Sequence, residues 1–233
     1  MKQIKQVYHW IMQHEMITLA LVGIVFASLW GFVELADEVL EGDSLWLDRY
    51  LLLSLRNPAD ATDPIGPSWV EEMARDVTAM GSVVVLTVLT AITAGYLKLT
   101  QQRWIAIFVV LAIVGGTLVS VAMKSGFDRP RPDLVPHETR IYTQSFPSGH
   151  SAMSAMVFLT LGALVARIQA TRTTRAYFLV VAFLLTASVG VSRVYLGVHW
   201  PTDVVAGWTF GLAWAAGSWL VFRNLERRFT AID

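Results

Sequence analysis

The feature that most constrains this chain is a series of six long apolar segments, separated by stretches that carry most of the charges. The segments are residues 17–33, 77–97, 104–122, 148–166, 176–192 and 204–222. Each comes close to the roughly 20 residues that a helix needs to cross about 30 Å of hydrocarbon. We therefore expect residues 1–233 to form one all-α, polytopic membrane domain with six transmembrane helices.

Composition supports a membrane location and excludes several kinds of site. The chain is 55% hydrophobic and 15% charged, with a mean hydropathy of +0.52, which is too apolar for an ordinary soluble domain. The absence of cysteine removes disulfides, thiolate metal sites and cysteine nucleophiles. A formal net charge of +0 gives no reason to expect nucleic acid as a partner.

The charged residues predict the orientation of the helices. Six spans place both termini on one side, and that side carries ten of the 18 basic residues but only three of the 18 acidic ones. The ten are Lys2, Lys5, Lys98, Arg103, Arg167, Arg172, Arg175, Arg223, Arg227 and Arg228, and the three are Glu15, Glu226 and Asp233. By the positive-inside rule, both termini are therefore cytoplasmic.

The first apolar segment and the outer segment that follows it require separate interpretation. Segment 17–33 could be a cleaved signal peptide, but no small-x-small site ends it and Glu34 follows, which favours an uncleaved span. The outer segment 34–76 contains Pro58, Pro64 and Pro67, which argue against a regular element there.

Within this outer segment, residues 45–56 have the pattern of a short amphipathic helix lying in the membrane interface. It combines the mainly apolar runs 45–47 and 50–55 with the charged residues Asp48, Arg49 and Arg56. The helix is either a lid packed on the outer ends of the spans or a guide for lipid access, and the first interpretation is favoured.

Three polar motifs lie at the ends of spans that the charge distribution places on the outer side. They read Lys-x6-Arg-Pro at 124–132, Pro-Ser-Gly-His at 147–150 and Ser-Arg-x5-His-x3-Asp at 192–203. His199 precedes Asp203 by four residues, so the carboxylate can take the proton of one ring nitrogen and leave the other as a lone-pair donor. A neutral histidine held in this way is a candidate nucleophile.

The same motifs contain groups that suit a phosphate. Lys124, Arg131 and Arg193 supply three cations, and each guanidinium can grip two oxygens. Ser148 and Gly149 stand where the fourth span begins, so unpaired backbone N–H groups of a helix N-terminus would face the ligand. Gly149 permits a close approach of the backbone, and Ser148 can cap the helix.

In order and spacing, these motifs resemble the type 2 phosphatidic acid phosphatase superfamily, and the signature covers residues 124–207. The members of this family are mostly membrane-embedded lipid phosphatases. The resemblance implies that His199 attacks phosphorus to form a phosphohistidine, that Asp203 orients His199, and that His150 protonates the departing oxygen and later activates water. It also implies phosphate binding by Lys124, Arg131, Ser148, Gly149 and Arg193, with no metal and no cofactor.

The expected function is hydrolysis of a lipid phosphate or pyrophosphate at the outer, periplasmic face of a bacterial cytoplasmic (inner) membrane. The family's substrates include undecaprenyl pyrophosphate, phosphatidylglycerol phosphate, phosphatidic acid and lipid A phosphates. An outward-facing site favours the first, because wall-polymer assembly leaves that carrier lipid as a pyrophosphate on the outer side. The sequence leaves the physiological lipid, the oligomeric state and any gating by segment 34–76 open.

Three alternatives share the same motifs. A lipid-to-lipid phosphotransferase would use the same phosphohistidine. A vanadate-dependent haloperoxidase uses a related anion site, but six apolar spans argue against it. A non-catalytic lipid-binding membrane protein would be expected to lose at least one of His150, His199 and Asp203, and all three are present.

Other polar residues are expected to lie outside the site. Arg129, Asp133, His137 and Arg140 share the outer loop but match no motif position, so we expect them to be solvated loop residues. His9 and His14 lie on the cytoplasmic side of the first span and cannot reach the outer motifs.

Overall fold

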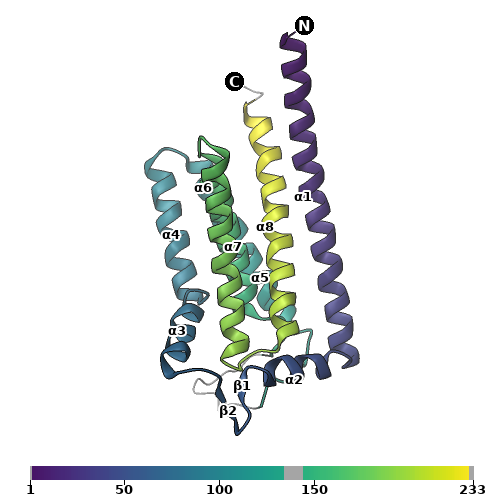
Figure 1. The fold of residues 1–233 in the computed structure, drawn as a ribbon. Helices are drawn as coiled ribbons and strands as arrows, with labels where there is room; N and C mark the ends of the chain where they lie inside the picture. Colours follow the sequence, from purple (N-terminus) through teal and green to yellow (C-terminus); the bar gives the residue numbers. More distant parts are fainter. Residues whose placement is uncertain (1, 134–143, 231–233) are drawn as a thin grey trace.

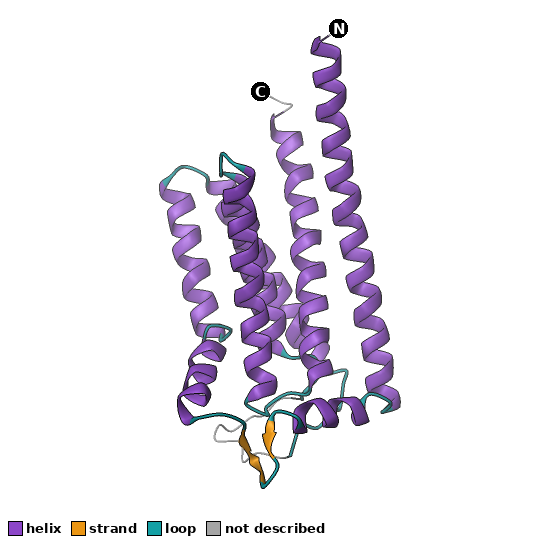
Figure 2. Cartoon of the chain, in the orientation of Figure 1, coloured by secondary structure: helices purple, strands orange, loops and turns teal. Residues whose placement is uncertain are grey.

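A computed structural model describes residues 2–133 and 144–230, and the side chains of 15–133 and 144–227. The chain folds into a bundle of long helices with a small two-stranded sheet at one end (Figures 1 and 2). The elements are α1 (Lys2–Glu41), α2 (Leu45–Leu53), β1 (Arg56–Asn57), β2 (Asp60–Pro64), α3 (Ser68–Ala79), α4 (Val83–Leu99), α5 (Arg103–Lys124), α6 (Gly149–Arg167), α7 (Arg172–Tyr195) and α8 (Pro201–Thr230).

The prediction of six membrane spans is confirmed in part. Within the described residues, five helical stretches are long and apolar enough to cross a membrane: residues 15–41 of α1, helices α5, α6 and α7, and residues 201–227 of α8. A sixth span exists only if α3 and α4 are taken together, and these two helices meet at a bend of 49°. The chain is therefore a multi-pass membrane protein with five or six candidate spans.

The second predicted span, 77–97, is wrong as a single straight helix, because it contains the break between α3 and α4. Ser82 caps the new helix by accepting a hydrogen bond from Val85 N at 3.3 Å. Gly81 allows this break to pack against α7, since a Cβ atom there would lie 2.5 Å from Val189 Cγ1. The break therefore brings the end of α3 against the other helices.

The outer segment is also more regular than its prolines predict. Arg56 and Pro64 pair across the antiparallel strands β1 and β2, and α3 begins directly after Pro67. This small sheet is the exception to the predicted all-α class among the described residues. Proline is tolerated at these positions because strand edges and helix N-termini do not need its missing N–H.

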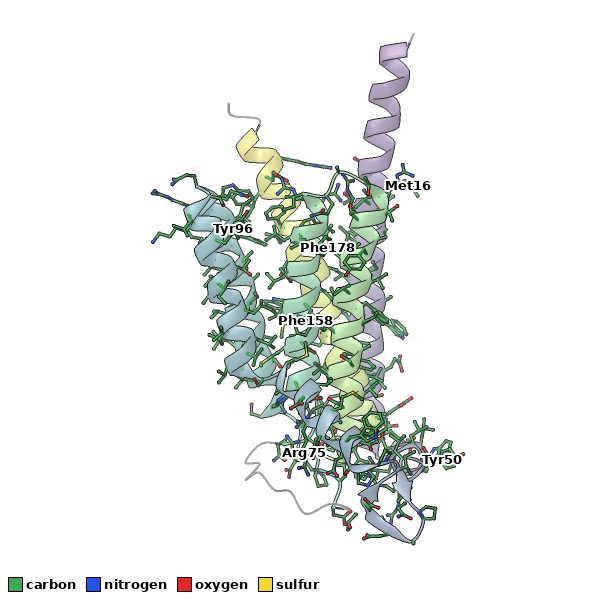
Figure 3. The ribbon with its side chains drawn as sticks, turned by 60° about the vertical axis from the view of Figure 1, so that its left-hand side comes forward. Met16, Tyr50, Arg75, Tyr96, Phe158 and Phe178 are labelled. Carbon is green, nitrogen blue, oxygen red and sulfur yellow. The ribbon has the colours of Figure 1, made fainter. Side chains whose placement is uncertain are left out.

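The described ends of the chain, Lys2 of α1 and Thr230 of α8, lie at one end of the bundle (Figure 1). The α4–α5 and α6–α7 connections lie at that same end, whereas α2, the small sheet and α3 lie at the other. Figure 3 places Met16 and Tyr96 toward the first end and Tyr50 and Arg75 toward the second. The segments that connect the long helices therefore lie at both ends of the bundle, as the predicted arrangement of loops on two sides requires.

The most buried helix is α6, which packs against both α7 and α8. Two glycines let α8 approach α6 closely. A Cβ atom at Gly207 would lie 2.7 Å from Ser148 O, and one at Gly211 would lie 2.5 Å from Ala155 Cβ. This close packing aligns the beginning of α6 with the beginning of α8, where two of the polar motifs lie.

The predicted amphipathic helix exists as α2, which is shorter than the predicted range of 45–56 and buries one of its charged residues. Asp48 is fully buried beside Leu52, whereas Trp46 and Tyr50 are 72% and 67% exposed. Arg56, expected on the same helix, lies instead in β1 and is buried. Asp48 therefore faces the protein, and the exposed residues of α2 are apolar or aromatic apart from Arg49.

Candidate active site

The third motif folds into the turn between α7 and α8. Gly197 has φ +68°, a left-handed conformation that permits this tight turn, and His199 follows two residues later with only 1% of its surface exposed. His199 Nδ1 lies 3.3 Å from Asp203 Oδ2 in the first turn of α8. If Nδ1 carries the proton and donates it to this carboxylate, then Nε2 keeps its lone pair.

Several donors hold the Asp203 carboxylate in place. Oδ2 accepts hydrogen bonds from Trp200 N at 2.9 Å and from Ser145 Oγ, and Oδ1 accepts one from Arg129 Nη1 at 2.5 Å. Both oxygens are therefore engaged, although the side chain is completely buried. Such a set of donors stabilises the ionised carboxylate that His199 requires.

Arg131 contacts the other nitrogen of the same ring. Its Nη1 lies 3.0 Å from His199 Nε2 and donates to Val198 O at 2.8 Å. Burial lowers the pKa of His199 to about 3, despite the opposing effect of Asp203, so the ring is neutral near neutral pH. A neutral ring with a proton on Nδ1 satisfies both contacts.

The second motif forms the N-terminus of α6. Ser148 Oγ accepts from Ser151 Oγ at 3.0 Å and from Ser151 N at 3.5 Å, and Ser148 N donates to Asp203 O at 2.9 Å. A Cβ atom at Gly149 would lie 3.4 Å from Lys124 Cε, so the lysine stem packs directly over this glycine. Lys124 Nζ in turn donates to Gln144 O at 3.1 Å.

His150 and Arg193 complete the cluster. His150, in the first turn of α6, lies within electrostatic range of Arg193, Lys124 and Arg131. Arg193 Nη1 donates to Thr78 Oγ1 of α3 at 3.2 Å. Among the described residues, Arg193 Nε is buried without an acceptor, an unusual situation that an anionic ligand would relieve.

The structure thus gathers all eight predicted site residues at one end of the bundle. They are Lys124, Arg131, Ser148, Gly149, His150, Arg193, His199 and Asp203. The cluster is strongly cationic, its backbone N–H donors come from a helix N-terminus, and its imidazole ring is oriented by a carboxylate. This arrangement can bind a phosphate and present a nitrogen nucleophile to it.

The expectation that Arg129 is a solvated loop residue is wrong. Its side chain is only 6% exposed and bridges Asp48 and Asp203. Asp133 is exposed as expected, whereas His137 and Arg140 lie outside the described residues.

Sequence reasoning also missed the roles of Ser145, Thr78 and Asp48 in the cluster. The signals were weak: Arg129 repeats the Arg-Pro pattern of Arg131, and Asp48 shares a helical face with the apolar Leu52. Neither signal identifies a partner, because the partners are distant in the sequence.

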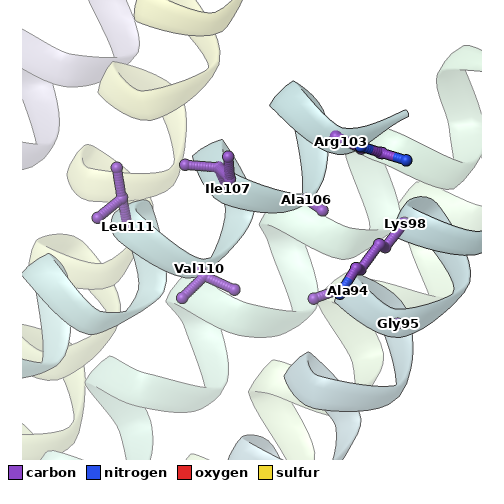
Figure 4. A pocket seen from close by; sticks show the side chains of 8 residues that line it. All are labelled: Ala94, Gly95, Lys98, Arg103, Ala106, Ile107, Val110 and Leu111. Atoms are coloured by element: carbon purple, nitrogen blue, oxygen red, sulfur yellow. The ribbon is translucent and has the colours of Figure 1, made fainter. Parts of the chain in front are cut away.

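An apolar pocket elsewhere is distinct from this cluster. It has a volume of about 500 Å³ between α4 and α5 and includes Lys98 and Arg103 in its lining (Figure 4). These residues flank the α4–α5 connection at the end of the bundle opposite the cationic cluster. This pocket is therefore not the candidate active site.

Comparison with known proteins agrees with the geometry. A family model described as PAP2 superfamily matches residues 104–227. Phosphatidylglycerophosphatase B of Bacillus subtilis (strain 168) is 31% identical over 147 residues, which cover 62% of this chain and 71% of the relative. Undecaprenyl-diphosphatase of Sulfolobus acidocaldarius is 31% identical over 140 residues, which cover 58% of this chain and 61% of the relative.

A solved structure has a similar fold. The crystal structure of a transmembrane PAP2-type phosphatidylglycerolphosphate phosphatase from Bacillus subtilis aligns with a TM-score of 0.70 and 22% identity. The alignment covers 89% of this chain and 96% of that chain. At this identity the likeness establishes the fold alone.

Proposed function

The chain belongs to the PAP2 superfamily and is a lipid phosphate phosphatase, and we propose that it works without a metal through a phosphohistidine on His199. The observation that carries this proposal is the pair of contacts on one ring: Asp203 Oδ2 at Nδ1 and Arg131 Nη1 at Nε2. The first contact orients the nucleophile, and the second puts a phosphate-binding cation beside the atom that attacks.

Phosphate binding would use the three cations and the N-terminus of α6. Arg131 can turn its donor from His199 Nε2 to a phosphate oxygen, which frees the nitrogen lone pair as the substrate arrives. Arg193 can offer its buried Nε, and Lys124 lies over Gly149, where backbone N–H groups are available. These donors would stabilise the charge on the equatorial oxygens of the transition state.

In the first step, Nε2 of His199 forms a bond to phosphorus while the bond from phosphorus to the departing oxygen breaks. Asp203 stabilises the positive charge that develops on the ring as it becomes phosphorylated. His150 gives its proton to the departing oxygen, so the lipid alcohol or lipid monophosphate leaves in protonated form. A bound phosphate favours the protonated state of His150, because it brings negative charge next to the ring.

In the second step, His150 takes a proton from water, and the resulting hydroxide attacks the phosphorus of the phosphohistidine. The phosphorus–nitrogen bond breaks, inorganic phosphate leaves, and His199 returns to its neutral form. The two histidines therefore have different roles, and each is restored at the end of one turnover.

We propose undecaprenyl pyrophosphate as the best candidate substrate, with phosphatidylglycerol phosphate and phosphatidic acid as alternatives. The names of the relatives cover both a polyprenyl diphosphate and a glycerophospholipid. The charge distribution supports cytoplasmic termini and a site at the periplasmic face of a bacterial inner membrane. This orientation favours undecaprenyl pyrophosphate, because that lipid is left on the outer side of the membrane.

The test is phosphate release by the purified full chain in nanodiscs, from each lipid alone and in the presence of a chelator. We expect release without metal and without an acceptor lipid, and none from His199→Ala. The control is His14→Ala. This residue lies on α1 close to Met16, toward the end of the bundle opposite the cationic cluster, so its replacement should leave the rate unchanged. Release only when an acceptor lipid is added would favour a phosphotransferase, and substantial release by His199→Ala would remove this residue as nucleophile.

A further inference from the structure

Arg129, which has no part in the proposed reaction steps, joins Asp203 to the helix α2. Its guanidinium lies between two carboxylates, with Nη1 2.5 Å from Asp203 Oδ1 and Nη2 2.5 Å from Asp48 Oδ2. Arg129 is 6% exposed, and both carboxylates are completely buried. Because buried charges are costly unless they are paired, the three side chains hold one another in a fixed arrangement.

Asp48 also accepts hydrogen bonds from the first turn of α8, next to Asp203. Its Oδ1 accepts from Thr202 N at 2.9 Å, and its Oδ2 accepts from Thr202 Oγ1 at 2.6 Å. Arg129 Nη1 also donates to Thr202 Oγ1, at 2.8 Å. A carboxylate from α2 therefore caps the N-terminus of α8 at the residue directly before Asp203.

The two carboxylate oxygens of Asp203 contact different partners. Arg129 engages Oδ1, whereas Oδ2 lies 3.3 Å from His199 Nδ1 and also accepts from Trp200 N and Ser145 Oγ. Without the guanidinium, Asp203 and Asp48 would be two buried negative charges with no cation between them. Proton uptake by Asp203 would then be favoured, and a protonated acid is a poor acceptor for the Nδ1 proton of His199.

We propose that Asp48 and Arg129 are positioning residues that keep Asp203 ionised and its Oδ2 directed at His199 Nδ1. The proposal rests on the proposed function, in which His199 is the nucleophile. It also links the chemistry to α2, whose exposed side is mostly apolar. A movement of α2 would therefore change the position of Asp203, and with it His199, through the two ion pairs of Arg129.

The test compares the full chain in nanodiscs with Arg129→Gln, Arg129→Lys and Asp48→Asn. The matched control is Arg75→Gln, which removes the arginine of an exposed ion pair with Glu71 on α3, 2.7 Å apart. For each variant, kcat and KM are measured on a lipid that the wild type hydrolyses. The ¹⁵N signals of labelled His199 report which ring nitrogen carries the proton, and their assignment uses His199→Gln.

We expect kcat to fall about 100-fold in Arg129→Gln and about 10-fold in Asp48→Asn, with KM changed by less than about 3-fold. Arg129→Lys restores the charge but cannot bridge both carboxylates, so it should recover part of the lost rate. In Arg129→Gln, His199 should show a mixture of ring tautomers in place of a proton on Nδ1. Arg75→Gln should match the wild type in every measurement.

A merely structural role would give a different result. The rate would then fall only in proportion to the folded fraction, and the His199 signals of the folded protein would stay unchanged, which would overturn the proposal. If Arg129→Gln does not fold, Asp48→Asn and Arg129→Lys decide: wild-type kcat and unchanged His199 signals in both would also overturn it. If the wild type releases no phosphate from any lipid, the proposed function fails, while the His199 signals still decide the positioning role.

Discussion

At the scale of single residues, the candidate site depends on how burial and charge act on His199. His199 precedes Asp203 by four positions in the sequence, and their side chains meet at the first turn of α8. The spacing predicted this pair because it is local. The contact of Arg131 with the other ring nitrogen joins residues far apart in the chain, so it required the fold.

The lowered pKa of His199 leads to a prediction about pH. Burial disfavours the charged ring, so the folded protein should keep His199 neutral between about pH 5 and 8, where a solvated histidine titrates. The unfolded chain takes up a proton near its ordinary pKa of about 6.5, whereas the folded chain does not. The stability that this ring contributes is therefore present above that value and is lost as the pH falls toward about 3.

The measurement is the ¹⁵N spectrum of histidine-labelled protein over this pH range. The His199 signals should stay constant, while an exposed histidine in a short peptide should titrate under the same conditions. Titration of His199 near its ordinary pKa would contradict the account of burial.

At the scale of helices, the close contact between α6 and α8 aligns the two N-termini that build the site. Gly207→Ala should destabilise the protein by about 1–3 kcal/mol and lower its activity, because the new Cβ would lie 2.7 Å from Ser148 O. Gly217→Ala on the same helix is the matched control, since nothing lies within 4 Å of its Cβ position. In thermal unfolding and in phosphate-release assays, Gly217→Ala should behave like the wild type. If Gly207→Ala and Gly217→Ala had the same stability and activity, the packing argument would be contradicted.

The exposed aromatic residues of α2 lead to a second prediction at this scale. Trp46 and Tyr50 should lie in the membrane interface, because aromatic side chains favour the headgroup region. Because the chain has no cysteine, a spin label can be attached to a single introduced cysteine, in either Trp46→Cys or Tyr50→Cys. Power-saturation measurements should find these labels more accessible to oxygen than to a water-soluble nickel complex.

A control label at Ala61→Cys, on the exposed strand β2, should show the opposite preference. If the two labels on α2 were as accessible to the nickel complex as this control, α2 would lie in water and not in the interface.

At the scale of the whole molecule, the two ends of the bundle differ in charge and in content. The end that carries the termini also carries the basic connections, and the other end carries the cationic cluster, α2 and the small sheet. Because flanking basic residues determine membrane orientation, we expect the first end to face the cytoplasm.

Single cysteines test this orientation in cells. A membrane-impermeant maleimide should label Ala61→Cys in intact spheroplasts, and should label Thr173→Cys only after the membrane is broken. Both positions are exposed and lie at opposite ends of the bundle. The reverse pattern of labelling would contradict a periplasmic site.

The sequence by itself determined the apolar spans, the family and the residues of the three motifs, because hydrophobic length and local spacing can be read along the chain. Only the tertiary structure decided that the second span is bent, that α2 turns its one buried carboxylate inward, and that Arg129 is part of the site. The physical reason is that each of these features depends on a partner distant in sequence. Val189 packs against the break at Gly81, and Asp48 and Asp203 pair with Arg129 only once the bundle brings them together.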